Sequence, residues 1–120
     1  MAKRRCISID FYDSEEFCEL TPQSKVLYTQ LLLHSDDEGV VINPKATMRI
    51  CKAKQRNLQE LLEHRFLLFV DGVYLVRHWH IHNTIQPSRK IDSVYREQLS
   101  KVVLNESREY ELKSNDLSTN

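Results

Sequence analysis

The chain has 120 residues, of which 41% are hydrophobic, and its formal net charge is zero. This length suffices for one small domain with a compact core, but not for two. The zero charge excludes a global attraction to nucleic acid, so binding of that kind would have to rest on local clustering of cations.

The cysteine content and the hydropathy pattern bear on location. Three cysteines, Cys6, Cys18 and Cys51, have no disulfide-framework spacing and indicate a reducing, cytoplasmic setting. The basic N-terminus is not followed by an apolar signal region, and no apolar run reaches membrane-spanning length. We therefore expect neither secretion nor a membrane partner.

The first third of the chain is predicted to be helical after a short arm. Residues 1–12 are basic and then alternating, which favours a short strand or an arm lying on the domain. Asp13 followed by Glu16 resembles a capping box and predicts a short helix over residues 14–20. Thr21 at an N-cap with Pro22 at the first helical position predicts the main core helix, over residues 22–35.

The middle of the chain predicts two helices and a hairpin. Asp36-Asp-Glu-Gly39 is interpreted as an acidic turn, Val40-Val-Ile42 as a small strand beside the hairpin, and Asn43-Pro44 as the start of a helix to about Cys51. A second helix, over residues 55–64, carries an apolar stripe of Leu58, Leu61 and Leu62, although Lys54 is a poor N-cap.

The hairpin is predicted over residues 66–77. Its two strands, 66–70 and 73–77, are rich in β-branched and aromatic residues and are separated only by Asp71-Gly72, which suits a type I′ turn. A helix, a basic helix and a hairpin form the back half of a winged helix-turn-helix. We therefore expect an α+β, mainly helical fold with a two-stranded wing.

The C-terminal part is predicted to add one more helix. Asp92 as a cap predicts a helix over about residues 93–104, with an apolar stripe of Val94, Tyr95, Leu99, Val102 and Val103. This stripe either contributes to a homodimer or larger oligomer or packs beside Phe11 and Phe17. Residues 105–120 are polar and lack periodicity, so a disordered tail is expected after a domain at 1–104.

The candidate DNA-binding residues follow from charge. Residues 44–65 hold six cations against two anions, whereas residues 10–38 hold eight anions and one cation. Base contacts are expected from the second helix and phosphate contacts from the preceding helix, unless these residues form only a solvated helix face. The wing over residues 66–77 is also expected to contact the DNA. The candidates are Lys45, Arg49, Lys52, Lys54, Gln55, Arg56, Asn57 and Gln59, joined by Arg77, Arg89 and Lys90.

Metal binding and catalysis find less support. His78, His80 and His82 would share one side of an extended backbone, an arrangement that suits zinc ligands. No cysteine or carboxylate lies within the string, so structural roles are the favoured interpretation, and Trp79 and Ile81 are expected in the core. With only two glycines, phosphate-cradling loops are excluded. Neither an enzyme nor a bound metal or cofactor is expected.

Several motifs resemble one protein family. His78-Trp-His-Ile-His-Asn83, the following Arg89-Lys90 and Tyr95-Arg-Glu-Gln98 resemble the N-terminal domain of phage replisome organisers, which are related to DnaD-like primosome proteins. Leu27-Tyr28, the acidic turn and Asn43-Pro44 extend the resemblance over roughly residues 3–100. Two positions differ from the family pattern: Arg65 stands where Gly is usual, and Ser88-Arg89 where Asp-Arg is usual.

The resemblance implies a role in replication. It implies binding to duplex origin DNA, recruitment of replication proteins such as a helicase loader, and a phage or prophage protein in the bacterial cytoplasm. Residues after 105 are too few for the C-terminal domain of full-length organisers, so the chain is expected to be a fragment or a stand-alone relative. Two alternatives remain: a winged-helix transcriptional repressor and a protein-interaction or oligomerisation module.

Overall fold

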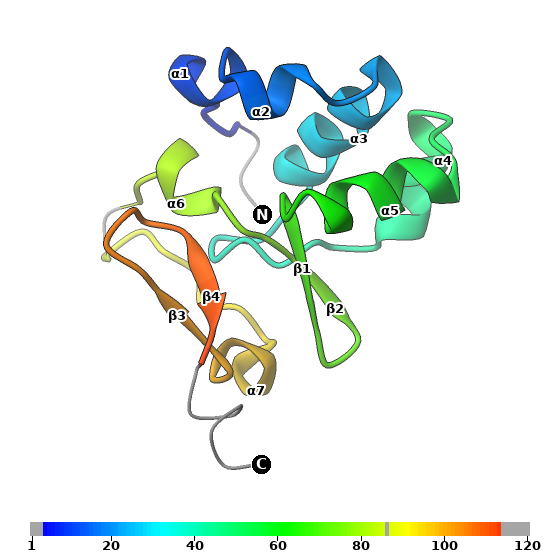
Figure 1. Cartoon of the computed structure of the whole chain (residues 1–120). Coiled ribbons are helices and arrows are strands. Elements are labelled where there is room, and N and C mark those ends of the chain that lie inside the picture. The colour runs from blue at the N-terminus through cyan, green and yellow to red at the C-terminus, as the bar shows by residue number, and fades with distance from the viewer. Residues whose placement is uncertain (1–3, 86, 114–120) are drawn as a thin grey trace.

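The computed structural model describes residues 4–85 and 87–113 and has an α+β architecture (Figure 1). The described residues form seven helices and two antiparallel two-stranded sheets. In chain order the elements are α1 (Ile9–Tyr12), α2 (Glu15–Cys18), α3 (Pro22–Leu33), α4 (Pro44–Ile50), α5 (Gln55–Glu63), β1 (Leu67–Val70), β2 (Val73–Val76), α6 (Trp79–His82), α7 (Arg96–Leu99), β3 (Val102–Leu104) and β4 (Tyr110–Leu112).

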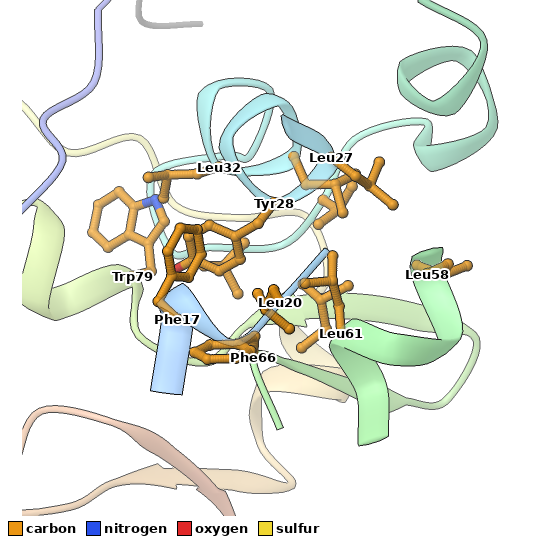
Figure 2. Packing of buried hydrophobic residues seen from close by; sticks show 13 residues of the cluster. Phe17, Leu20, Leu27, Tyr28, Leu32, Leu58, Leu61, Phe66 and Trp79 are labelled. Atoms are coloured by element: carbon orange, nitrogen blue, oxygen red, sulfur yellow. The ribbon is translucent and has the colours of Figure 1, made fainter. Parts of the chain in front are cut away.

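The core is built around α3, as its start signal and apolar spacing predict. Leu27, Tyr28, Leu31 and Leu32 of this helix are fully buried. Leu58 and Leu61 of α5 are buried in the same cluster as the α3 residues (Figure 2), so the predicted stripe on the second helix is confirmed as the buried face. Between them lies a group of aromatic rings, with Phe17 5.3 Å from Tyr28 and 5.7 Å from Phe66 between ring centroids.

The hairpin forms as predicted. Leu67 faces Val76 and Val70 faces Val73 across the ladder. Asp71 has φ 46° and Gly72 has φ 83°, the two positive values that a type I′ turn requires.

The predicted short strand beside the hairpin is present as isolated pairing. Val40 bridges Leu75, the Val41 amide donates to the Tyr74 carbonyl at 2.9 Å, and the Val76 amide donates to the Gly39 carbonyl at 2.8 Å. The acidic turn is thereby joined to β2.

The N-terminal predictions need two corrections. Residues 9–12 form the short helix α1 rather than a strand, because Ser8 caps it by accepting the Phe11 amide. The cap of α2 is Ser14, whose hydroxyl accepts the Phe17 amide, so Asp13 does not form the predicted capping box.

The C-terminal helix predicted over residues 93–104 is wrong. Only Arg96–Leu99 is helical, and the β-branched residues after it form β3, which pairs with β4. Tyr95, Leu99 and Val102 pack with Val70 and Leu75 of the hairpin in a second apolar cluster, not beside Phe11 and Phe17. Residues 105–113 are therefore part of the fold rather than a tail, and residues 114–120 lie outside the described residues.

Candidate nucleic-acid interface

Helix α4 and the turn after it are held firmly against α3. Asn43, in the left-handed region at φ 51°, accepts the Ala46 amide on its side chain and so caps α4. At the other end, Gln23 of α3 donates from Nε2 to the Cys51 carbonyl at 2.6 Å. The Ala53 amide then donates to the Met48 carbonyl at 2.9 Å, which fixes the path into α5.

A cationic hollow lies between α4 and the start of α5. Its volume is about 410 Å³, and it is lined by Lys45, Met48, Arg49, Lys52, Ala53 and Gln55. Lys45, Arg49 and Lys52 are all exposed. The three predicted phosphate-contacting residues are thus brought together around one concave surface.

The outward face of α5 continues this surface. Lys54, Gln55, Arg56 and Gln59 are exposed, whereas Leu58 and Leu61 face inward. Within the part of the chain that the structure describes, none of the five cations on α4, the turn and α5 lies within ion-pair distance of a carboxylate. By contrast, five cations elsewhere are paired with acids: Arg5, Arg77, Lys90, Arg96 and Lys101.

Asn57 is not part of this surface, so its prediction as a base-contacting residue is wrong. Its side chain is buried, with Oδ1 accepting the Lys54 amide at 2.9 Å and Nδ2 donating to Ser24 Oγ at 3.2 Å. Asn57 thus supplies the half of a capping box in which the side chain of the third helical residue accepts the amide of the N-cap residue.

Arg77 and Lys90, also predicted as DNA contacts, have internal partners. Arg77 Nη2 lies 3.0 Å from Glu109 Oε1, and its side chain is mostly buried. Lys90 Nζ lies 3.3 Å from Glu38 Oε1. Arg89 is exposed, but it lies on the segment after α6, away from α4 and α5 in the sequence.

Glu60 holds α5 onto the start of α3. It accepts hydrogen bonds from the Thr21 hydroxyl at 2.9 Å and from Ser24 Oγ. The bond from Ser24, aided by those from Thr21, lowers the pKa of Glu60. The negative charge of Glu60 is thereby directed away from the exposed face of α5.

The three histidines do not share one face, because their segment is helical rather than extended. His82 Nδ1 accepts the Ser8 amide at 2.8 Å, and its Nε2 lies 2.9 Å from the Tyr28 hydroxyl. His80 Nε2 lies 2.8 Å from the Tyr110 hydroxyl. Burial lowers the pKa of His78 to about 3, with Arg77 adding to the effect, and burial lowers that of His82 to about 4.

The acidic turn connects segments from both ends of the chain, a role that its sequence did not reveal. Arg5 Nη2 lies 2.9 Å from Asp37 Oδ1, and the Ile91 amide donates to Asp37 Oδ2 at 3.0 Å. Glu38 accepts the Ser93 amide at 2.8 Å and pairs with Arg96. Burial opposes ionisation of both carboxyls, but these partners outweigh it and lower the pKa of each.

Comparisons of the chain with protein-family models, with curated proteins and with solved structures find no match. Among the helices of residues 4–85 and 87–113, none combines the length and the apolar character that crossing a membrane requires.

Proposed function

We propose that this protein is a winged-helix DNA-binding domain that contacts duplex DNA through α4 and α5. The order of α4, α5 and the β1–β2 hairpin, with the Val40 bridge beside it, supports a winged-helix assignment. The observation that carries the proposal is a group of five exposed cations with no acid partner among the described residues. Three of them, Lys45, Arg49 and Lys52, line the hollow between the two helices, and Lys54 and Arg56 lie at the start of α5.

Each part of this surface has a distinct role in the proposal. Lys45, Arg49 and Lys52 surround a concave surface that suits the phosphate backbone, while Arg56 and Gln59 project from α5 and suit base edges. We expect the β1–β2 hairpin to contribute less to DNA binding than α4 and α5. It carries an acid at its tip, and Arg77 at its end is paired with Glu109.

We further propose that the protein acts in phage-type replication initiation and that its target is origin DNA. This part of the proposal rests on the resemblance of the His78-Trp-His-Ile-His-Asn83 string to phage replisome organisers. Origin fragments and promoter fragments of equal length, compared in a gel-shift competition, separate this role from repression.

The test of DNA binding is its salt dependence. Three phosphate contacts, from Lys45, Arg49 and Lys52, would give a slope of about −2.7 in log affinity against log salt concentration. We expect Lys45→Gln and Arg49→Gln each to make the slope shallower by about 0.9, as one released counterion per phosphate contact requires. Arg56→Gln should instead weaken binding to the preferred sequence relative to random duplex. Fluorescence anisotropy with a labelled duplex measures both quantities.

The matched control is Lys113→Gln, which removes a positive charge just after β4. In Figure 1 the lower end of β4 lies far from α4 and α5, so this change should leave the slope nearly unaltered. Equal effects of Lys113→Gln and Lys45→Gln would contradict the assigned surface, and a slope near zero would contradict DNA binding itself.

A further inference from the structure

A second concave surface lies outside α4 and α5. It is a groove of about 270 Å³ between the acidic turn and the irregular segment before α7, and its lining includes Asp36, Asp37, Ile42, Ile91, Asp92 and Val94. We refer to these residues as the acidic groove.

The groove exposes three apolar side chains together. Ile42 is 37% exposed, Ile91 64% and Val94 85%. Single exposed apolar residues are common on protein surfaces, but three that line one hollow form a patch of the kind that binding sites present.

The wall of the groove is fixed in place. The Ile91 amide donates to Asp37 and the Ser93 amide donates to Glu38, both with buried carboxylates. The Tyr95 amide donates to Ser93 Oγ at 3.1 Å, which holds the next turn of backbone. Ile91 and Val94 are thus held in position before any partner arrives, and such preorganisation favours binding.

The charge of the groove is negative. Arg5 is almost fully buried and is neutralised by Asp37, so it offers little charge to a ligand. Asp92 is 77% exposed in its side chain and lies 3.7 Å from Lys90, while Asp36 uses Oδ1 to accept the amides of Glu38 and Val40. Because Arg5 and Asp37 cancel, the carboxylates that remain in the lining are those of Asp36 and Asp92, with Lys90 beside Asp92, at the edge of a mostly apolar surface.

We propose that the acidic groove binds a peptide segment of a partner protein in which aliphatic side chains are flanked by Lys or Arg. The aliphatic side chains would cover Ile91 and Val94, and the cations would meet Asp36 and Asp92. Because the lining residues lie outside α4 and α5, the proposal does not depend on DNA binding.

The test uses three capped tetrapeptides as probes: Lys-Leu-Leu-Lys, Glu-Leu-Leu-Glu and Lys-Ser-Ser-Lys. Titration of the ¹⁵N-labelled full chain should show amide shifts centred on residues 91–94 with the first peptide. We expect that peptide to bind at least about tenfold more tightly than either of the others, because only it matches both the charge and the apolar surface. Absence of binding by all three overturns the proposal.

Variants with exposed side chains make the test independent of folding. Asp92→Lys should reverse the preference between the Lys-flanked and Glu-flanked peptides, and Val94→Ser should weaken the first peptide by about threefold or more. The control Ile9→Ser removes a similarly exposed aliphatic side chain on α1, at 76% against 85% for Val94, and should change neither result.

Two further results would overturn the proposal. One is equal binding of the Lys-flanked and Glu-flanked peptides, and the other is shifts centred on α4 and α5. Shifts of residues 91–94 that depend on protein concentration without peptide would assign the groove to a second copy of the chain instead.

Discussion

Arg65 has a left-handed backbone conformation of the kind that usually favours Gly. It follows α5 with φ 62°, and its amide donates to the Leu62 carbonyl while the Phe66 amide donates to the Leu61 carbonyl. These two bonds define a Schellman motif, in which the left-handed position is usually Gly. The helix end therefore forms although Arg stands where the resembled family has Gly.

We expect Arg65→Gly to stabilise the protein by about 0.5–1 kcal/mol, because relief of the left-handed conformation exceeds the added freedom of the unfolded chain. Glu63→Gly, two residues earlier in the helix, should instead destabilise it by about 1 kcal/mol. Urea unfolding of both variants measures the difference. A loss of stability in Arg65→Gly would show that the Arg side chain contributes contacts that outweigh the backbone strain.

At the scale of elements, the sequence predicts correctly those helices and strands whose signals lie in neighbouring residues. The Asp-Gly turn and the spacing of Leu58 and Leu61 are read from adjacent residues, and both elements are confirmed. Residues 93–104 have an apolar pattern that suits either a helix or a strand, and their partner, the β1–β2 hairpin, lies far away in the sequence. Asn57 was misassigned for the same reason, since its partner Ser24 lies on another helix.

The exposed cations of the candidate site, by contrast, could be predicted. Their clustering and their position opposite the Leu58 stripe follow from the sequence alone. The role of the acidic turn could not be predicted, because a run of three acids does not indicate which distant amides and guanidinium groups it binds.

We expect Glu38→Gln to destabilise the protein by about 1–3 kcal/mol, because Lys90 and Arg96 then lose a carboxylate that is buried and hydrogen-bonded. The exchange of the Ser93 amide hydrogen should accelerate more than that of amides in α3. Glu97→Gln, which neutralises an exposed acid on α7, is the control and should leave both quantities nearly unchanged. An unaltered Ser93 exchange rate would contradict the role given to Glu38.

For the whole molecule, the buried histidines predict sensitivity to acid. Ser8 donates to Nδ1 of His82, so this imidazole must be neutral to accept the bond. The folded pKa of His82 is about 4 and that of His78 about 3, both below the ordinary value of 6.5. The unfolded chain therefore binds these two protons first, and stability is lost as the pH falls from about 6.5 toward 4.

The expected loss is about 1.4 kcal/mol per pH unit for each histidine within that window. Asp37, Glu38 and Glu60, whose pKa values are lowered on folding, add to the loss below their ordinary range. Urea midpoints measured between about pH 7 and 5 give the slope.

His82→Gln keeps an acceptor for Ser8 but cannot be protonated, so its stability should vary less with pH than that of the unaltered chain. Equal midpoints at both ends of the range would contradict the assignment.

The contacts of the acidic turn must form in a particular order while the chain is being synthesised. Arg5 leaves the ribosome before Asp37, but the side-chain partners of Glu38 lie at Lys90, Ser93 and Arg96, and its carbonyl accepts the Tyr110 hydroxyl. A chain grows at about 5–20 residues per second. For several seconds, therefore, a nascent chain can assemble α3 and α5 before the carboxylate of Glu38 meets its partners, and the full set of bonds to the turn can form only once Tyr110 has emerged.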